Sequence, residues 1–371
     1  HKTPLFIWKH YDSMLLWQVI TDSNIKSAVR LTSIPSLLCG LLTSVVAPCF
    51  IIWKLNQDDS PLFGDAKFAS DADLKKSKLL KWEKENDKDI LVGRYKGKYL
   101  WYTAPDFVSL GAGTRAGKGA AIGIPNMLVK KHSIIALDPK QELWKITSKV
   151  RELLLGNKVY LLDPFNSKTH QCNPLFYVDL KAESGAKDLL KLVEILFPSF
   201  GLTGAEAHFN NLAGQYWTGL AKLLHFCINF APDWLEEFSV KPVFSIGTVV
   251  DLYSNIDREQ VLNNRESFEE LAKGDETALF HLRDALTKIR EYHETEDEQR
   301  SSVDGSFRKK MSLFYLPTVR KCTDGNDFDL LQMSREDITV YVGVNAEDMI
   351  LAYDFLNLFF NLVVLTTLSE N

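Results

Sequence analysis

The sequence predicts an α/β protein with a parallel sheet and a phosphate-binding loop. An all-helical domain is inserted into the sheet domain, and a transmembrane helix precedes it. Three features predict this: a glycine-rich loop between a short predicted strand at Phe107–Leu110 and a predicted helix, apolar strands separated by helical spacing, and an uncharged stretch from Leu31 to Trp53. Alternation of strand and helix is typical of a parallel sheet. The 371 residues are enough for more than one domain.

The uncharged stretch from Leu31 to Trp53 comes first. A membrane-spanning helix needs roughly 20 mostly apolar residues. Arg30 and Lys54 bracket the stretch, and Trp53 stands where an interfacial aromatic residue belongs. We expect a transmembrane helix at residues 31–54, with a buried core helix as the alternative. The lysines that follow favour a cytoplasmic location for the rest of the chain. Because the sequence starts with His1 rather than Met, we also expect residues to be missing ahead of it.

Overall composition excludes some functions and leaves others open. The net charge is −5 and the pI is near 6.0, so bulk charge gives no tendency toward nucleic acid. The five cysteines lack C-x-x-C or His-paired spacing. We therefore expect no disulfide framework and no metal-ligand set, and a reducing compartment for most of the chain.

The soluble part is predicted to begin with small elements. Residues 64–80 indicate a short turn and a lysine-rich helix. Ile90–Tyr102 alternates well enough for a β-hairpin turning at Lys96-Gly97.

The phosphate-binding loop lies at Ala112–Ala120. Its glycines allow backbone N–H groups to face a polyphosphate, the following helix adds its dipole, and Lys118 reaches the outer phosphates. Ala112 replaces the first glycine of the general motif, and Gly119 replaces the Ser or Thr that would hold Mg²⁺. An ordinary glycine-rich turn is the alternative.

Two further strands are predicted after the loop. Ser133–Leu137 ends in Asp138, and Lys158–Leu162 ends in Asp163. Ligands of such sheets sit at the carboxyl ends of the strands. Asp138 is therefore a candidate for orienting water or Mg²⁺, with capping of the next turn as the alternative. Asp163, which precedes a proline, is expected to be structural.

Helical patterns dominate residues 181–310. Ala205–Phe230 places its apolar residues on one stripe, Ser267–Glu291 predicts one or two helices broken near Gly274, and Glu294–Asp304 is predicted to be a polar loop. Ile338–Val344 then predicts a buried strand, and Tyr353–Leu368 an apolar helix.

Several separated motifs together resemble one family. They are GDAKFAS at 64–70, AGTRAGKGAAIGIPNML at 112–128, IIALDPKQELW at 134–144, KVYLLDPFNSKTHQCNPL at 158–175 and NDFDLLQMSREDITVYVGVNAED at 326–348. They are similar to motifs of the coupling ATPases of bacterial type IV secretion and conjugation systems, the TraG/VirD family of FtsK/HerA-like translocases. That family's loop has the form T-R-x-G-K-G followed by I-P-N, which accounts for Ala112 and Gly119.

The resemblance implies a RecA-like P-loop NTPase domain with an inserted all-helical domain. Five parts would follow: a periplasmic segment at 1–30, the transmembrane helix at 31–54, the first part of the nucleotide-binding domain at 55–180, the helical domain at 181–310 and the second part of the nucleotide-binding domain at 311–371.

The resemblance also implies an activity and partners. Such a protein would be a homo-hexameric ATPase of the bacterial inner membrane with its ATPase domain in the cytoplasm. It would use ATP and Mg²⁺ to deliver relaxase–DNA complexes or effector proteins to a type IV secretion channel. Single-stranded DNA would be a possible further partner. Lys118 and Asp138 would be catalytic. The nucleotide-binding residues would be Ala112, Gly113, Thr114, Arg115, Ala116, Gly117, Lys118, Gly119 and Ala120.

Some alternatives stay open at this point. Arg115 could contact phosphate, a neighbouring subunit or only solvent, and Arg308–Lys310 is either a DNA-contacting patch or a solvated face. No apolar strand ends in the Asp-Glu pair of a Walker B element, so the chain as given is expected to lack efficient turnover. A membrane docking receptor that binds nucleotide without hydrolysing it is the alternative function. A segregation-type DNA pump is disfavoured by the helical insert.

Overall fold

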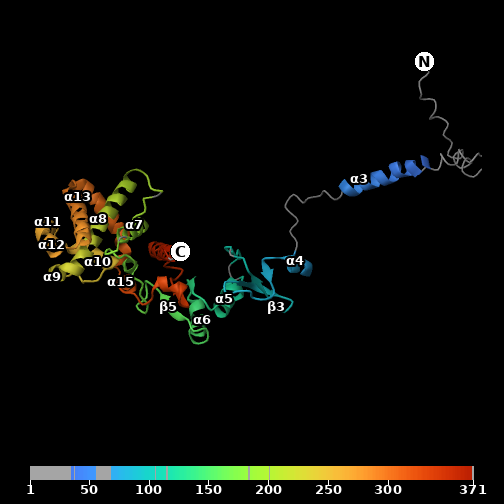
Figure 1. The fold of residues 1–371 in the computed structure, drawn as a ribbon, viewed down its shortest axis with the longest axis horizontal. Coiled ribbons are helices and arrows are strands. Elements are labelled where there is room, and N and C mark those ends of the chain that lie inside the picture. The colour runs from blue at the N-terminus through green and yellow to red at the C-terminus, as the bar shows by residue number, and fades with distance from the viewer. Residues whose placement is uncertain are drawn as a thin grey trace, which may run out of the picture. The chain divides into compact units, whose positions relative to one another are not determined.

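The computed structural model describes residues 35–36, 38–55, 68–104, 106–113, 116–182, 184–199 and 201–369. The chain forms two compact units, His1–Lys76 and Ser77–Asn371 (Figure 1). The predicted periplasmic segment at 1–30 lies outside the described residues, as do Thr114 and Arg115 of the predicted phosphate-binding loop.

The first unit contains helical segments separated by residues that are not described. The π-helix η3 (Leu42–Val46) continues into α3 (Ala47–Leu55), and the short helix α4 (Asp71–Lys76) follows. The large apolar side chains from Leu38 to Trp53 are 51–58% exposed. Across the described ranges, no helix combines the length and apolar character that a membrane span requires. The predicted transmembrane helix is therefore not confirmed.

An antiparallel sheet opens the second unit. Its strands are β1 (Leu80–Lys81), β2 (Ile90–Tyr95) and β3 (Lys98–Tyr102), in the order β1-β3-β2. Lys96 and Gly97 both have positive φ, 47° and 81°. Two such residues form the type I′ turn whose twist suits a hairpin. The predicted hairpin is thus confirmed.

A parallel sheet forms the centre of the α/β part. Its strands are β4 (Ile134–Leu137), β5 (Lys158–Leu162) and β6 (Ile338–Val342). The order is β4-β6-β5, so the last strand along the chain lies between the two earlier ones. In register, Val342 pairs with both Leu137 and Leu162. All three predicted strands are confirmed.

Both faces of the parallel sheet are covered, which explains why every residue of β6 is buried. On one face, Tyr341 packs with Leu161 and with Met127 of α5 (Ile124–Val129), and partly buried Leu143 and Trp144 of α6 (Glu142–Leu153) join them. The π-helix η4 (Gly119–Gly123) leads into α5. On the other face, Val340 and Val342 belong to the main core together with α16 (Tyr353–Ser369).

A run of helices separates β5 from β6 along the chain. Its members are η5 (Pro174–Tyr177), α7 (Gly185–Leu196), α8 (Gly204–Phe230), α9 (Pro232–Glu237), α10 (Ile246–Asn255), α11 (Arg258–Asn263), α12 (Arg265–Leu271), α13 (Glu276–Glu294), α14 (Asp297–Met311), η6 (Ser312–Tyr315), α15 (Pro317–Thr323) and η7 (Leu330–Ser334).

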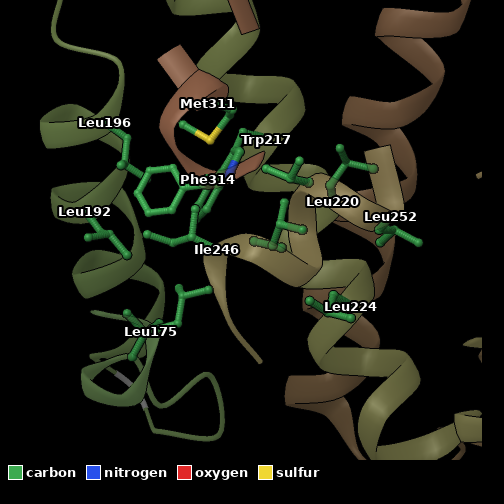
Figure 2. Packing of buried hydrophobic residues seen from close by; sticks show 14 of the residues in the cluster. Leu175, Leu192, Leu196, Trp217, Leu220, Leu224, Ile246, Leu252, Met311 and Phe314 are labelled. Atoms are coloured by element: carbon green, nitrogen blue, oxygen red, sulfur yellow. The ribbon is translucent and has the colours of Figure 1, made fainter. Parts of the chain in front are cut away.

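Helix α8 is the centre of the main core. Figure 2 shows Trp217, Leu220 and Leu224 of this helix among side chains from α7, α10 and η6. The apolar stripe predicted for 205–230 is confirmed at Tyr216, Leu220 and Leu224, which are buried. This core runs without interruption into β6. A separate domain at 181–310 accordingly stays a prediction.

The polar loop predicted at 294–304 is wrong, because helix α14 starts at Asp297. Charged residues fill most of its surface, which hides the helical pattern in the sequence. Val303, Phe307 and Met311 nevertheless recur every four residues and are all at most 2% exposed. A single buried row of this kind is enough to hold a helix against its neighbours.

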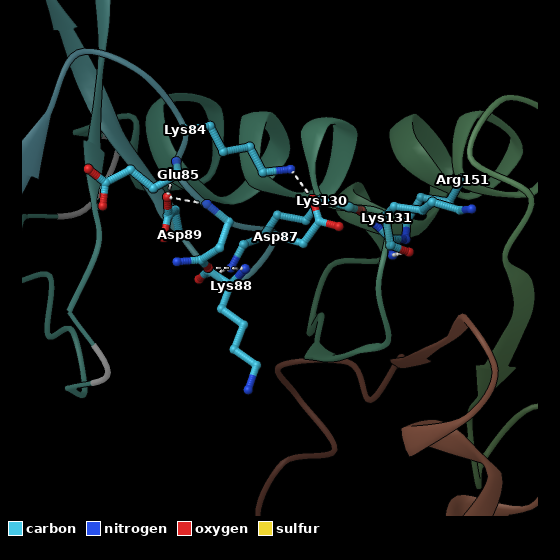
Figure 3. Close-up of polar contacts among 9 residues, drawn as sticks. Lys84, Glu85, Asp87, Lys88, Asp89, Lys130, Lys131 and Arg151 are labelled. Atoms are coloured by element: carbon cyan, nitrogen blue, oxygen red, sulfur yellow. Dashed lines mark hydrogen bonds and ion pairs between the residues drawn. The ribbon is translucent and has the colours of Figure 1, made fainter.

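A buried guanidinium lies at the amino ends of the parallel strands. Figure 3 shows Arg151 of α6 beside the segment that contains Lys130 and Lys131. Its side chain donates to the carbonyl oxygens of Met127 (2.6 Å), Lys130 (2.6 Å) and His132 (2.9 Å). It also donates to Thr339 Oγ1 on β6 (2.7 Å). One side chain thus ties the end of α5 to the start of the sheet.

Candidate functional site

The predicted phosphate-binding loop is a solvent-exposed turn at the start of a helix. Gly117 has φ of +79°, a conformation that suits glycine. The backbone then enters helix, with Ala121 N donating to Gly117 O (2.8 Å). The described loop residues Ala112, Gly113 and Ala116–Ala120 are all exposed. A ligand would therefore meet the loop directly from solvent.

Lys118 folds back over this loop. Its Nζ donates to the carbonyl oxygen of Ala112 at 2.6 Å. The ammonium group therefore lies across the mouth of the loop, where the phosphates of a bound nucleotide would compete with a backbone carbonyl for it. A charge-assisted bond to phosphate is the stronger of the two.

The strand predicted before the loop is wrong in this structure. Residues 107–110 have no regular secondary structure, and Phe107 is fully exposed. A strand requires a neighbour to accept and donate its backbone hydrogen bonds. Within the described part of the chain, no strand pairs with 107–110. Of the predicted strand, loop and helix, the structure contains only the loop and the helix.

Asn126 fixes the helix that follows the loop. Its Oδ1 accepts from Leu91 N (2.9 Å), and its Nδ2 donates to Leu91 O (2.8 Å). Strand β2 lies at the edge of its sheet, so backbone groups on its outer side are available to the amide. The Asn of the I-P-N motif therefore joins α5 to the antiparallel sheet.

Asp138, the second predicted catalytic residue, caps helix α6. Its Oδ1 accepts from Glu142 N (3.1 Å) and its Oδ2 from Trp144 N (2.8 Å). This is the capping alternative raised by the sequence. Lys118 and Asp138 share no hydrogen bond or ion pair in the described structure. A catalytic role for Asp138 stays a prediction.

A second group of polar atoms lies where the three parallel strands end. Gln141 Nε2 donates to Asp163 Oδ2 (2.8 Å) and to Gly343 O (3.0 Å). It thereby joins the residue after β5 to the residue after β6. Gln141 itself has φ of +53°, a strained value for a residue with a side chain.

Asp163 is buried within this group. Burial raises the pKa of its carboxyl group, while hydrogen bonds from Phe165 N and Gln141 lower it. Phe165 N donates to Oδ1 at 3.2 Å. Both oxygens are engaged, which agrees with the structural role expected from the sequence.

The missing side chain of Gly343 leaves the room that Gln141 occupies in this arrangement. A Cβ at this position would lie 2.9 Å from Gln141 Nε2 and 2.9 Å from Leu161 Cδ1. Sequence reasoning missed Gln141, Gly343 and Asn126 as parts of the site. Strain at Gln141 has no signature in the sequence, whereas the glycine directly after a buried strand was a usable signal.

A family model described as Type IV secretory system Conjugative DNA transfer matches residues 67–371. The chain belongs to this family. The prediction made from the separated motifs is therefore confirmed, and the sequence is that of a type IV coupling protein.

Members of the family with curated descriptions are distant relatives. Protein VirD4 of Rhizobium radiobacter is 27% identical over 271 residues, which is 72% of this chain and 36% of the relative. Conjugal transfer protein TraG of Escherichia coli is 22% identical over 354 residues, covering 88% of this chain and 52% of the relative. The chain thus spans between about a third and about half of the length of these proteins.

Solved structures of a coupling protein are also similar. The bacterial conjugative coupling protein TrwBdeltaN70 in its unbound monoclinic form aligns with a TM-score of 0.38 and 12% identity, covering 69% of this chain and 50% of that one. TrwB in complex with ADP and Mg²⁺ gives a TM-score of 0.31 and 12% identity, covering 64% and 53%. These TM-scores are low, so the α/β assignment rests on the parallel sheet and its flanking helices.

Proposed function

We propose that this chain is an ATP-driven coupling protein that recruits relaxase–DNA complexes or effector proteins and delivers them to a type IV secretion channel. Membership of the conjugative DNA transfer family supports the general role. The observation that carries the nucleotide part is the exposed loop in which Lys118 Nζ bonds to the Ala112 carbonyl. A lysine in this position is available to a polyphosphate without any rearrangement of the fold.

Within this proposal, the loop residues Ala112–Ala120 bind the phosphates through their backbone N–H groups. Lys118 leaves the Ala112 carbonyl and neutralises charge on the outer phosphates. Asp138 acts by positioning the start of α6, because both of its oxygens already accept from backbone amides. Thr114 and Arg115 complete the loop, and Arg115 is a candidate for contact with phosphate or a neighbouring subunit.

Magnesium is expected to arrive with the nucleotide. Gly119 offers no side-chain oxygen where many phosphate-binding loops have Ser or Thr. Mg²⁺ usually keeps several waters and binds through few protein ligands when substrate phosphates are present. We propose that phosphate oxygens and water hold the ion here, and that the ion neutralises phosphate charge.

We further propose that residues 31–54 attach the protein to the bacterial inner membrane and that hexamers form there, with the ATPase domain in the cytoplasm. Exposed apolar side chains from Leu38 to Trp53 support the attachment, because such surface is unfavourable in water. Flotation of the protein with liposomes tests this. A chain beginning at residue 55 that floats equally well contradicts it.

Nucleotide binding and hydrolysis form the central test. Lys118→Ala should abolish binding of a fluorescent ATP analogue, whereas Lys149→Ala, which removes an exposed lysine of α6, should leave binding unchanged. ATP turnover by the full-length protein with and without single-stranded DNA then separates DNA cargo from protein cargo. Tight binding by the Lys118→Ala variant would overturn the assignment of the loop.

A docking receptor that binds but does not hydrolyse nucleotide is the second candidate. In the described structure, none of the strands β1–β6 is followed by an Asp-Glu pair, the usual source of the water-activating acid. The receptor hypothesis predicts ATP binding without turnover, together with substrate recruitment that survives in Lys118→Ala. Turnover by the full-length wild-type protein excludes it.

A further inference from the structure

The run of helices contains an open cavity of about 640 Å³ that the proposed ATPase does not use. Its walls come from α10, α11, α14 and η6. Two arginines, Arg258 and Arg308, line it together with Ser254 and Ser312, whose hydroxyls donate to backbone carbonyl oxygens. A pocket of several hundred Å³ is the size that binds small molecules.

Aromatic rings hold Arg258 in place. Tyr216 and Tyr292 are stacked with centroids 3.7 Å apart. The guanidinium lies 5.7 Å from the first ring and 5.2 Å from the second. Its Nε donates to Tyr216 Oη at 2.7 Å. Because the aromatic contacts and the Nε hydrogen bond fix the plane of the Arg258 guanidinium, its terminal amino groups are preorganised.

Arg308 is held in the same way by Tyr253. Its Nε donates to Tyr253 Oη at 3.2 Å, and the guanidinium lies 6.0 Å from the ring centroid. Tyr253 stacks on Phe307 at 4.0 Å. Lys309, by contrast, pairs with Glu206 on α8 at 3.7 Å. Arg308 therefore belongs to the cavity rather than to a continuous basic patch with Lys309.

One carboxylate, that of Asp304, lies in the cavity, and one of its oxygens accepts from two tyrosine hydroxyls. Asp304 Oδ1 accepts from Tyr253 Oη (2.7 Å) and from Tyr292 Oη (2.6 Å). Burial, together with these bonds, raises the pKa of both tyrosines, which keeps them as donors. Among the described residues, neither arginine forms an ion pair. The cavity thus carries a net positive charge.

We propose that this cavity binds the phosphate group of a small phosphorylated molecule. Two preorganised guanidiniums match the geometry of phosphate oxygens. The cavity has room for more than an inorganic ion. Acidic residues outnumber basic ones between 181 and 310, which disfavours a long nucleic acid because its repeated charges would be repelled.

Titration calorimetry in a Lys118→Ala background tests the proposal, because that change removes the phosphate-binding loop as a competing site. Inorganic phosphate and a mononucleotide are the probes, at constant ionic strength. Both should bind saturably, and the mononucleotide more tightly. Arg308→Gln should weaken binding about tenfold or more, since a charge-assisted bond to phosphate is lost. Lys309→Gln is the matched control and should change nothing.

A second measurement locates the site. In ¹⁵N spectra of arginine side chains, the Nε resonances of Arg258 and Arg308 should shift when phosphate is added, and Arg283 should not. Binding that Arg308→Gln leaves unchanged overturns the proposal, as does phosphate binding that shifts neither resonance. Binding of an oligonucleotide but not of a mononucleotide would assign the cavity to nucleic acid instead. All of these measurements use the Lys118→Ala background, so a failure of this proposal says nothing against the proposed ATPase site.

Discussion

Arg151 shows how a single side chain can organise the edge of a sheet. Its five N–H groups are distributed over backbone carbonyls and Thr339 rather than over a carboxylate. Burial lowers the pKa of the guanidinium, since the charged form is desolvated. The planar fork is needed because no other side chain offers five donors.

Arg151→Lys should destabilise the protein by on the order of 3 kcal/mol, because lysine has three donors and leaves buried carbonyls unpaired. Urea unfolding measures the change. Arg265→Lys is the control, since Arg265 pairs with Glu269 on the surface, and it should cost less than about 1 kcal/mol. Equal effects of the two changes would show that the buried network contributes nothing specific.

Gly343→Ala is expected to displace Gln141 and so separate the ends of β5 and β6. A loss of about 1–3 kcal/mol is typical of such overpacking. Gly305 provides a contrast, because a Cβ there meets nothing within 4 Å in the middle of α14. Gly305→Ala should stabilise the protein by about 0.5–1 kcal/mol. Thermal unfolding of both variants distinguishes crowding from general glycine effects, and an unchanged melting temperature for Gly343→Ala would contradict the crowding.

At the scale of single residues, the sequence predicts which residues belong to a motif better than it predicts which residues they contact. Gly117 and Lys118 follow from local spacing, because a loop motif is contained in a few consecutive residues. Arg151 and Asn126 do not, because their partners come from distant segments and any Arg or Asn on a helix is by default expected at the surface.

Among the elements, α5 carries the loop and is anchored by Asn126. Asn126→Ala should remove both bonds to Leu91 and leave its backbone groups without their partner. We expect faster hydrogen exchange at the Leu91 amide, by roughly ten- to a hundredfold for a loss of about 1–3 kcal/mol. Asn361→Ala, whose amide bonds only to Asn357 on its own helix, is the control. Unchanged exchange at Leu91 would contradict the anchoring role.

The sequence predicts an element well when the element's own residues carry the whole signal. The strands at 134–137, 158–162 and 338–342 are mostly apolar, and the break near Gly274 coincides with its φ of +98°. The strand at 107–110 and the loop at 294–304 were predicted wrongly. Residues 107–110 have the apolar pattern of a strand, but no described strand pairs with them. In residues 294–304 the many charged residues hide the single row of buried side chains that marks helix α14.

For the whole molecule, one buried and two partly buried histidines link stability to pH. Burial lowers the pKa of His225 to about 4, and it also lowers the pKa values of His281 and His132. The unfolded chain therefore binds more protons than the folded one between about pH 6.5 and 4. Stability should be full above this window and fall as the pH falls through it.

Urea midpoints at pH 7, 6, 5 and 4 measure this effect. The double variant His225→Gln/His281→Gln should show a shallower fall, because two of the groups that take up protons on unfolding are removed. His208→Gln, at an exposed position, is the control and should keep the wild-type slope. A double variant with an unaltered slope would show that carboxylates alone govern the acid sensitivity.

The arrangement of the whole chain was the hardest level to predict. The alternation of strands and helices indicates a parallel sheet, but strand order depends on which edges meet in space. Likewise, the separate domain that the sequence predicts at 181–310 stays a prediction, because the core continues from α8 into β6. Local patterns record which residues are buried but not which core they share.

The central position of β6 affects how the protein is made. Ser133, just before β4, accepts a hydrogen bond from Ile338, 205 positions later in the chain. A ribosome must therefore synthesise every helix between β5 and β6 before the two early strands acquire their common neighbour. Until then β4 and β5 have no strand between them, and such late, long-range pairing is slow and prone to aggregation. Nascent chains that stop short of Ile338 should accordingly depend on chaperones.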